Sequence, residues 1–152
     1  MITDPKKIKS ELERSMPDVS LALQETGLMV SPEDLLCVCQ FLKNSSRFSM
    51  DYLSSVTAVD YPPEGMEIVY QLYSMSHESG PIVLRVRLGR TSPKLDSVTP
   101  VWRSAELQER EIYDLYGVYF ENHPDLRRIF MWDGFKGHPM RKDYVPEDQN
   151  RI

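Results

Sequence analysis

The chain has 152 residues, of which 41% are hydrophobic and 27% charged, an ordinary composition for a globular protein. Its net charge of −5 argues against a general affinity for nucleic acid or anionic membranes, because both favour cationic surfaces. No apolar run approaches the roughly 20 residues that cross a bilayer, and the Lys-rich N-terminus lacks the apolar core of a secretion signal. We therefore expect a chain that is neither secreted nor membrane-spanning.

The first elements in chain order are a helix and a pair of short strands. A helix is predicted over residues 4–15, with Asp4 as N-cap and Pro5 at the first helical position. Two short strands joined by a Glu-Thr-Gly turn follow within residues 18–30. The sequence Ser-Pro-Glu-Asp then starts a second helix, which the apolar spacing carries to about Asn44.

The second helix contains both cysteines of the chain, Cys37 and Cys39. Residues two apart on a helix point about 200° away from each other, so this pair cannot share a metal ion or a disulfide there. We interpret both side chains as reduced structural thiols.

Longer strands and a third helix follow. The strands are predicted within residues 50–62, 66–76 and 81–89, with the turn between the last two at Gly80-Pro81. After a loop, a helix runs from about Val101 to Tyr116 and stops at Gly117. This order predicts an α+β fold, with a mainly antiparallel or mixed sheet and helices on one face.

The C-terminal part has a different character. It contains several Pro and Gly residues and no sustained helical or strand period, yet it is rich in aromatic residues. Disordered tails are poor in aromatics, whereas aromatic and Arg side chains dominate protein–protein contacts. We predict an α+β core domain of residues 1–117 and an irregular, extended, partner-binding C-terminal segment of residues 118–152, called the strap below. Its aromatics include Tyr119, Phe120, Phe130, Trp132, Phe135 and Tyr144.

The third helix carries charges at positions of two kinds. Helical winding places Glu109 within the apolar arc, and Arg110, Glu111 and Asp114 outside it. Arg110 and Asp114 are interpreted as members of solvated i,i+4 pairs. A buried unpaired carboxylate costs several kcal/mol, so Glu109 is predicted to clamp a cation of the strap or of a partner. The strap candidates are Arg127, Arg128 and Arg141.

Catalytic and nucleic-acid interpretations find little support. Glu109 and Glu111 diverge on a helix and cannot flank one substrate bond. His123 and His138 each precede a proline and lack the spacing of a metal pair, and there is no phosphate-binding glycine loop and no nucleophile elbow. From Glu121 to Ile152, six Lys or Arg balance six Asp or Glu, whereas a nucleic-acid strap should be positive. We expect no catalytic, cofactor-binding or metal-binding residue in this chain.

A family resemblance rests on the run from Glu109 to Met131, "EREIYDLYGVYFENHPDLRRIFM", and on the later "GHPMRKDY". Together with the upstream "LSSVTAVDYP", "VYQLYS" and "DSVTPVWRSAELQERE", this run resembles the C subunit, or 30-kDa-type subunit, of respiratory complex I. That complex is the proton-pumping NADH:quinone oxidoreductase. The resemblance covers roughly residues 53–144. Glu106-Leu107 and Tyr116 depart from the family pattern at packing positions.

The resemblance implies a non-catalytic structural subunit of the hydrophilic arm, whose oxidoreductase and translocase activity belongs to the whole complex. It implies no cofactor in this chain, FMN and iron–sulfur clusters in partner subunits, and docking to subunits D, B and I, with the strap along D. It also implies a peripheral location on the cytoplasmic side of the membrane, with membrane association only through the complex. The residues expected at the partner interface or tail clamp are Glu109, Arg110, Glu111, Asp114, His123, Asp125, Arg127, Arg128, His138, Arg141, Lys142, Asp143 and Tyr144.

Other functions stay open from the sequence. They are a subunit of a related ferredoxin-, F420H2- or hydrogenase-linked membrane complex, a free-standing interaction domain, and an enzyme that uses Glu109 or His123. The scaffold interpretation predicts a strap that becomes ordered only with its partners, whereas the enzyme interpretation predicts a pocket that holds both Glu109 and His123.

Overall fold

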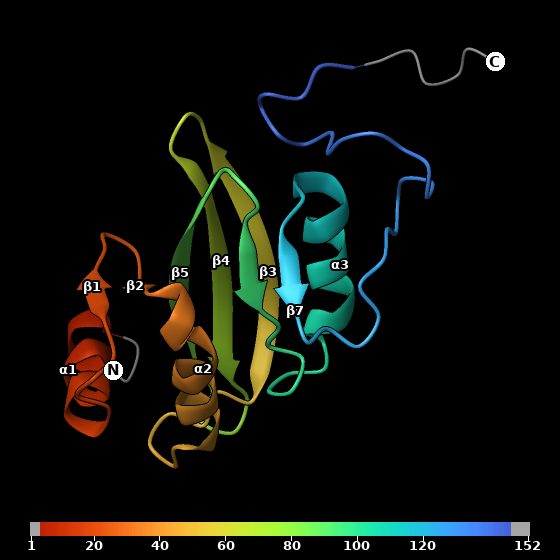
Figure 1. Ribbon diagram of the computed structural model, residues 1–152. Coiled ribbons are helices and arrows are strands. Elements are labelled where there is room, and N and C mark those ends of the chain that lie inside the picture. The colour runs from red at the N-terminus through yellow and green to blue at the C-terminus, as the bar shows by residue number, and fades with distance from the viewer. Residues whose placement is uncertain (1–3, 147–152) are drawn as a thin grey trace.

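The computed structural model describes residues 4–146 and contains two sheets and three α-helices (Figure 1). The elements in chain order are α1 (Pro5–Ser15), β1 (Leu21–Leu23), β2 (Leu28–Val30), the 3-10 turn η1 (Pro32–Asp34), α2 (Leu35–Asn44), β3 (Tyr52–Tyr61), β4 (Gly65–Ser74), β5 (Ser79–Gly89), β6 (Lys94–Asp96), α3 (Ala105–Tyr116) and β7 (Tyr119–Glu121).

The main sheet has five strands in the order β1-β2-β5-β4-β3. Neighbouring strands are antiparallel except β2 and β5, which are parallel. The long strands β3, β4 and β5 follow one another through short turns, and such connections make antiparallel pairs. The predicted α+β fold with a mainly antiparallel, mixed sheet is confirmed.

The three helices cover one face of this sheet. Strand residues alternate between the two faces, and Ile68 and Tyr70 of β4 and Leu84 of β5 are fully buried in the core. The apolar sides of α1, α2 and α3 join the same hydrophobic cluster. On the opposite face, Glu67 of β4 forms ion pairs with Arg85 and Arg87 of β5. The predicted placement of the helices on one face is therefore confirmed.

Three local predictions differ from the structure. The β4–β5 turn lies at residues 75–78, and Gly80-Pro81 is inside β5, where Gly80 (φ 140°) packs against the ring of Tyr73. Helix α3 begins at Ala105 and not at about Val101. The residues just before it form turns, and the apolar spacing of the sequence does not distinguish such turns from a helix. Strands β6 and β7, which pair in parallel, were expected to be irregular because three residues are too few to show a strand period.

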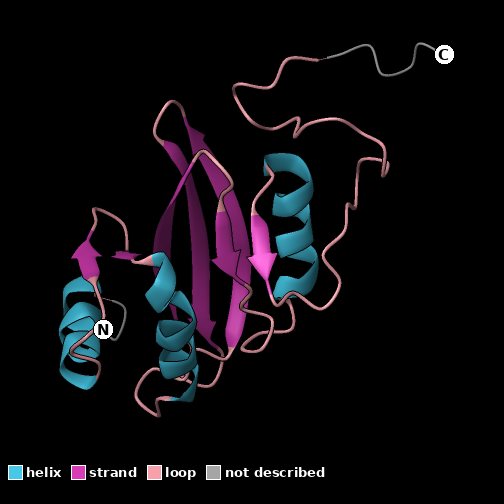
Figure 2. Cartoon of the chain, viewed as in Figure 1, coloured by secondary structure: helices cyan, strands magenta, loops and turns pink. Residues whose placement is uncertain are grey.

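Helix α3 ends as predicted at Gly117, which adopts the left-handed conformation with φ 77°. The strap begins with β7, which lies beside α3, and has no further helix or strand up to residue 146 (Figures 1 and 2). Among residues 4–146 there is no helix whose length and apolarity would let it span a membrane.

Candidate partner-binding site

Glu109 is fully buried on α3, as its place in the apolar arc predicts. The hydroxyl of Ser97 donates to Oε2 at 2.6 Å, and the backbone N–H of Val98 donates to Oε1 at 2.8 Å. Desolvation raises the pKa of Glu109 to about 7, and these two hydrogen bonds oppose the rise. The carboxyl group therefore joins the segment before α3 to the helix.

None of the three strap arginines predicted to pair with Glu109 does so, and a cation supplied by a partner stays a prediction. Arg127 pairs instead with Asp125, Arg128 with Asp114, and Arg141 with Asp143. A basic side chain of the strap, that of His123, does approach Glu109, and its Nε2 atom lies 3.9 Å from Oε2. Hydrogen bonds from a hydroxyl and a backbone amide take the place of the expected ion pair.

His123 joins the start of the strap to the first turn of α3. Its side chain is fully buried, and Nδ1 accepts a hydrogen bond from the backbone N–H of Asp125 at 3.0 Å. Nε2 lies 2.8 Å from the carbonyl oxygen of Glu106. Because Nδ1 faces a donor and Nε2 faces an acceptor, the neutral tautomer with hydrogen on Nε2 satisfies both contacts. Both ring nitrogens are thus used in holding the turn.

Asp114 binds the strap most extensively. The backbone N–H groups of Ile129, Phe130 and Met131 donate to Oδ2 at 3.1, 2.7 and 3.0 Å, and Arg128 Nη1 donates to Oδ1 at 2.9 Å. Desolvation raises its pKa, but these donors outweigh that effect and hold the pKa below its usual value. Its interpretation as a solvated side chain is wrong, since Asp114 is fully buried.

Arg110 is also buried rather than solvated. Its guanidinium donates from Nε to the carbonyl of Arg127 and from Nη2 to the carbonyl of Arg128, both at 3.1 Å. Strap carbonyls therefore replace the expected i,i+4 carboxylates. Glu111, which lies next to it on α3, is exposed.

Arg128 continues these contacts along the strap. Its Nη2 atom donates to the carbonyls of Phe135 and Gly137, both at 3.0 Å, and the guanidinium lies 5.5 Å from the centre of the Phe135 ring. The Phe135 ring in turn contacts the Trp132 ring edge-on, with 4.9 Å between the ring centres, and stacks on the Tyr144 ring, with 6.2 Å between the ring centres. Hydrogen bonds from the Arg128 guanidinium thereby hold together about ten residues of irregular chain.

A second attachment lies at the far end of the strap. Asp60, buried at the end of β3, pairs with Arg90 and accepts a hydrogen bond at Oδ2 from the backbone N–H of Lys142 at 2.7 Å. Arg90 also pairs with Asp143 at 2.8 Å, and Arg141 donates to the carbonyl of Arg90 at 2.8 Å. Sequence reasoning missed Asp60 and Arg90. The sequence did contain a signal for Asp60, because this acidic residue falls at one of the alternating positions of β3 whose side chains face inward.

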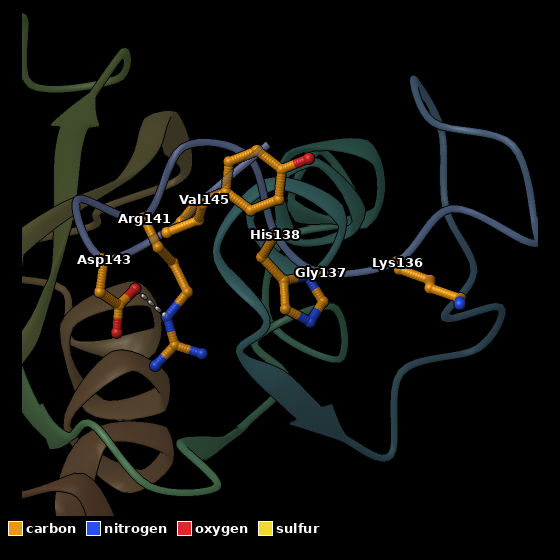
Figure 3. A pocket seen from close by; sticks show the side chains of 7 residues that line it. Lys136, Gly137, His138, Arg141, Asp143 and Val145 are labelled. Atoms are coloured by element: carbon orange, nitrogen blue, oxygen red, sulfur yellow. Dashed lines mark ion pairs between the residues drawn. The ribbon is translucent and has the colours of Figure 1, made fainter. Parts of the chain in front are cut away.

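His138 lies between the two attachments along the chain and contacts the end of α3. Its Nδ1 atom lies 3.0 Å from the carbonyl oxygen of Asp114, and its ring packs so closely on Gly117 that an added Cβ would stand 2.6 Å from Cδ2. Beside it is a hollow of about 310 Å³, with the Arg141–Asp143 ion pair at one end and Lys136 at the other (Figure 3). Its lining residues are Lys136, Gly137, His138, Arg141, Asp143, Tyr144 and Val145.

From residue 129 onward, the strap turns backbone amides toward the core and exposes several large apolar side chains. Phe130 is 61% exposed, Trp132 52% and Met140 54%, while neighbouring backbone amides bind Asp114. Exposed aromatic side chains on a fixed backbone are typical of a protein-binding surface. Cys37 and Cys39 form no disulfide; Cys39 is buried, whereas Cys37 is exposed. Residues 4–146 contain no cluster of three or more His, Cys, Asp or Glu that could hold a metal ion.

The structure thus consists of an α+β core and a strap that is anchored to it and exposes large apolar side chains. Residues 28–150 match the family described as "Respiratory-chain NADH dehydrogenase, 30 Kd subunit". The chain belongs to this family and is a subunit of the complex I type, as its sequence resemblance indicated.

Curated relatives agree with this assignment. The C subunit of the NADH-quinone oxidoreductase of Geobacter metallireducens is 42% identical over 151 residues, which cover 95% of this chain and 90% of the relative. The corresponding C 2 subunit of Rhizobium meliloti is 46% identical over 117 residues, and the match covers 76% of this chain but only 63% of that relative.

Two solved structures have the same fold. A trypsin-resistant fragment (1-134) of Nqo5 superposes with a TM-score of 0.61 at 26% identity, covering 81% of this chain and 100% of the fragment. A chain of the membrane-bound sulfane sulfur reductase, described as an archaeal respiratory membrane complex, superposes with a TM-score of 0.73 at 22% identity, covering 97% and 98% of the two chains.

Proposed function

We propose that this chain is a non-catalytic structural subunit of the hydrophilic arm of a proton-pumping NADH:quinone oxidoreductase, and that it docks subunits D, B and I. The observation that carries the proposal is the strap, which presents large apolar side chains outward in a chain of the complex I 30 Kd family. The residues that contribute most to binding at protein interfaces are typically aromatic side chains held in place by well-packed neighbours.

In this proposal the redox chemistry belongs to partner subunits, which hold FMN and iron–sulfur clusters. This chain keeps the partners at fixed separations through its rigid core and strap. It lies on the cytoplasmic side and reaches the membrane only through the complex. The buried polar contacts support this structural role, because each of them joins two segments of the chain. They are made by Glu109, Arg110, Asp114 and His123.

The test is to express the full chain with an affinity tag in its own cells, in place of the untagged one, and to purify it under native conditions from detergent-solubilised membranes. We expect mass spectrometry to recover subunits D, B and I together with NADH:quinone reductase activity. Recovery without these subunits would contradict the proposal. Recovery with ferredoxin-, F420H2- or hydrogenase-linked subunits would replace it with the related membrane complex.

A variant locates the docking surface. Phe130→Ala combined with Trp132→Ala removes two exposed rings, and we expect at least a tenfold loss of co-purified subunits because interface aromatics carry much of the binding free energy. Tyr52→Ala is the matched control, because Tyr52 is a 47% exposed aromatic on β3, outside the strap. Equal recovery from both variants would place docking elsewhere on the chain.

A further inference from the structure

The two histidines of the strap meet different partners, and the difference decides how each responds to acid. His123 lies between an N–H donor and a carbonyl acceptor, whereas His138 donates from Nδ1 to a carbonyl. We propose that the first turn of the strap, residues 123–126, is a pH-sensitive switch that is closed while His123 is neutral and opens when its Nδ1 takes up a proton. The switch is a property of the chain by itself and does not depend on the proposed docking function.

The switch works through one lone pair. In the closed turn, Nδ1 of His123 accepts the Asp125 N–H at 3.0 Å, while Nε2 donates to the carbonyl of Glu106 at 2.8 Å. A protonated imidazole donates from both nitrogens and accepts at neither. A proton on Nδ1 would therefore face the Asp125 N–H, and two donors repel each other. Proton uptake and the closed turn exclude each other.

The core side of His123 offers no charge that would compensate an imidazolium in acid. The imidazole is fully buried, and Glu109 of α3 lies 3.9 Å from it. Desolvation raises the pKa of Glu109 to about 7, so its carboxyl becomes neutral as the pH falls. Tyr70 of β4 and Cys39 of α2 interact electrostatically with Glu109, and desolvation raises the pKa of each. All three side chains are therefore neutral in acid.

The strap side offers only a carboxylate that is already engaged. Arg127 forms two hydrogen bonds with Asp125 and holds its pKa below the usual value, and Arg110 of α3 adds to this effect. Asp125 is thus ionised, but it is exposed and paired. If this carboxylate bound a proton on Nδ1 of His123, the Asp125 N–H would lose its acceptor, so the turn would open in that case as well.

His138 provides the contrasting case. Its Nδ1 atom lies 3.0 Å from the Asp114 carbonyl, which only accepts, so Nδ1 carries the hydrogen in the neutral ring. Acid adds a proton at Nε2 and leaves this donation in place. The Asp114 carbonyl belongs to the last turn of α3, where positive charge is favoured, and Lys136, Arg141 and Asp143 line the hollow beside the ring (Figure 3). The contact of His138 therefore survives protonation.

Proton linkage sets the size of the response. An exposed imidazole takes up a proton near about pH 6.5, whereas the closed turn has no place for it. The equilibrium constant for opening should therefore rise about tenfold between about pH 7.5 and about pH 5.5. Over the same range Glu109 takes up a proton in the folded state and stabilises the fold, because its pKa is raised to about 7. General unfolding would thus change in the opposite direction.

Nuclear magnetic resonance of the ring nitrogens in the full chain tests the geometry of the switch. At about pH 7.5, where an exposed imidazole is neutral, we expect His123 to carry its hydrogen on Nε2 and His138 on Nδ1. The opposite tautomer at His123 would overturn the proposal, because its Nδ1 would then not accept the Asp125 amide.

Amide exchange of Asp125 measures the opening. Relative to an unstructured peptide of the same sequence at the same pH, we expect its protection to fall about tenfold between about pH 7.5 and about pH 5.5. The Phe130 amide is the internal reference and should stay protected, because its acceptor Asp114 has a pKa below the usual value and remains ionised. Unchanged protection of Asp125 would overturn the switch.

Three variants assign the response to His123. His123→Asn keeps an acceptor for the Asp125 amide and cannot titrate, so the protection should no longer depend on pH. His138→Asn is the matched control, since it keeps a donor for the Asp114 carbonyl, and it should respond as the parent does. Glu109→Gln should also respond, because Gln resembles the protonated carboxyl. A full response in His123→Asn, or none in either of the other variants, would overturn the proposal.

The parent chain decides the matter if His123→Asn does not form the closed turn. Once the ring nitrogens show hydrogen on both Nδ1 and Nε2 of His123, the Asp125 amide should have lost its protection. A doubly protonated His123 beside a protected Asp125 amide would overturn the switch, because the proton and the closed turn would then coexist.

Discussion

Two carboxylates on the same helix illustrate how an interior accommodates acidic groups. Asp114 receives four hydrogen bonds, one of them from a guanidinium, and its pKa lies below the usual value. Glu109 receives two from neutral groups, and its pKa is raised to about 7. Both are fully buried, so the number and charge of the donors decide which is ionised.

Glu109 should make stability depend on pH near neutrality. Its pKa is 4.5 in an exposed chain and about 7 in the folded protein, so the folded state binds a proton that the unfolded state releases between these values. The stabilisation is complete below about 4.5 and is lost as pH rises through 7, a difference on the order of 3 kcal/mol.

Glu109→Gln keeps the shape of the protonated side chain and removes its titration. We expect the variant to gain stability relative to the parent between pH 5 and pH 8, measured as the free energy of unfolding in urea. A difference between the two proteins that is the same at both pH values would contradict this prediction.

At the scale of elements, α3 organises the C-terminal third of the chain. Arg110 and Asp114 bind the strap, and Glu109 binds the segment before the helix. Gln108 accepts the Val56 amide of β3 at 2.8 Å, so the helix also closes an edge of the main sheet. The end of α3 at Gly117 also contributes to the attachment of the strap, because the His138 ring packs directly on that glycine.

Gly117→Ala should therefore be costly. Gly117 has φ 77°, which disfavours a side chain, and the new Cβ would lie 2.6 Å from Cδ2 of His138. We expect a loss of about 2 kcal/mol in the free energy of unfolding. Gly89→Ala is the matched control, because no atom lies within 4 Å of its Cβ position. Similar losses in the free energy of unfolding from both substitutions would contradict this prediction, because the left-handed backbone and the His138 contact at Gly117 would then add nothing to the cost.

At the scale of the whole molecule, the core and the strap share residues. Val118 and Phe120 are buried within the hydrophobic core although they follow α3, and β7 pairs with β6. Packing therefore continues past residue 117, where the sequence changes character. After Leu126, which packs against the core, the strap is attached through polar contacts and exposes Phe130, Trp132 and Met140.

Truncation tests where the folding unit ends. A chain that stops after Gly117 lacks Val118 and Phe120, and loss of a buried Phe side chain alone typically costs about 3–5 kcal/mol. A chain that stops after Leu126 keeps these residues and the His123 turn. We expect only the longer chain to show cooperative thermal unfolding by circular dichroism. Cooperative unfolding of the shorter chain would place the boundary at Gly117.

The sequence by itself determined the family, the α+β class, the end of α3 at Gly117 and the burial of Glu109. These features follow from periodicity, capping residues and a long motif, all of which are local in the chain. It also indicated that the strap contains interface residues, and that assignment stays a prediction.

Only the tertiary structure decided which groups meet. It replaced the expected arginine partner of Glu109 with Ser97 and Val98, and it made Asp114 rather than Glu109 the residue that binds the strap. It also brought Asp60 to Lys142, 82 residues away along the chain. The physical reason is that helical periodicity reports only which side of a helix a residue occupies. Whether that side meets solvent or another segment depends on how distant segments pack.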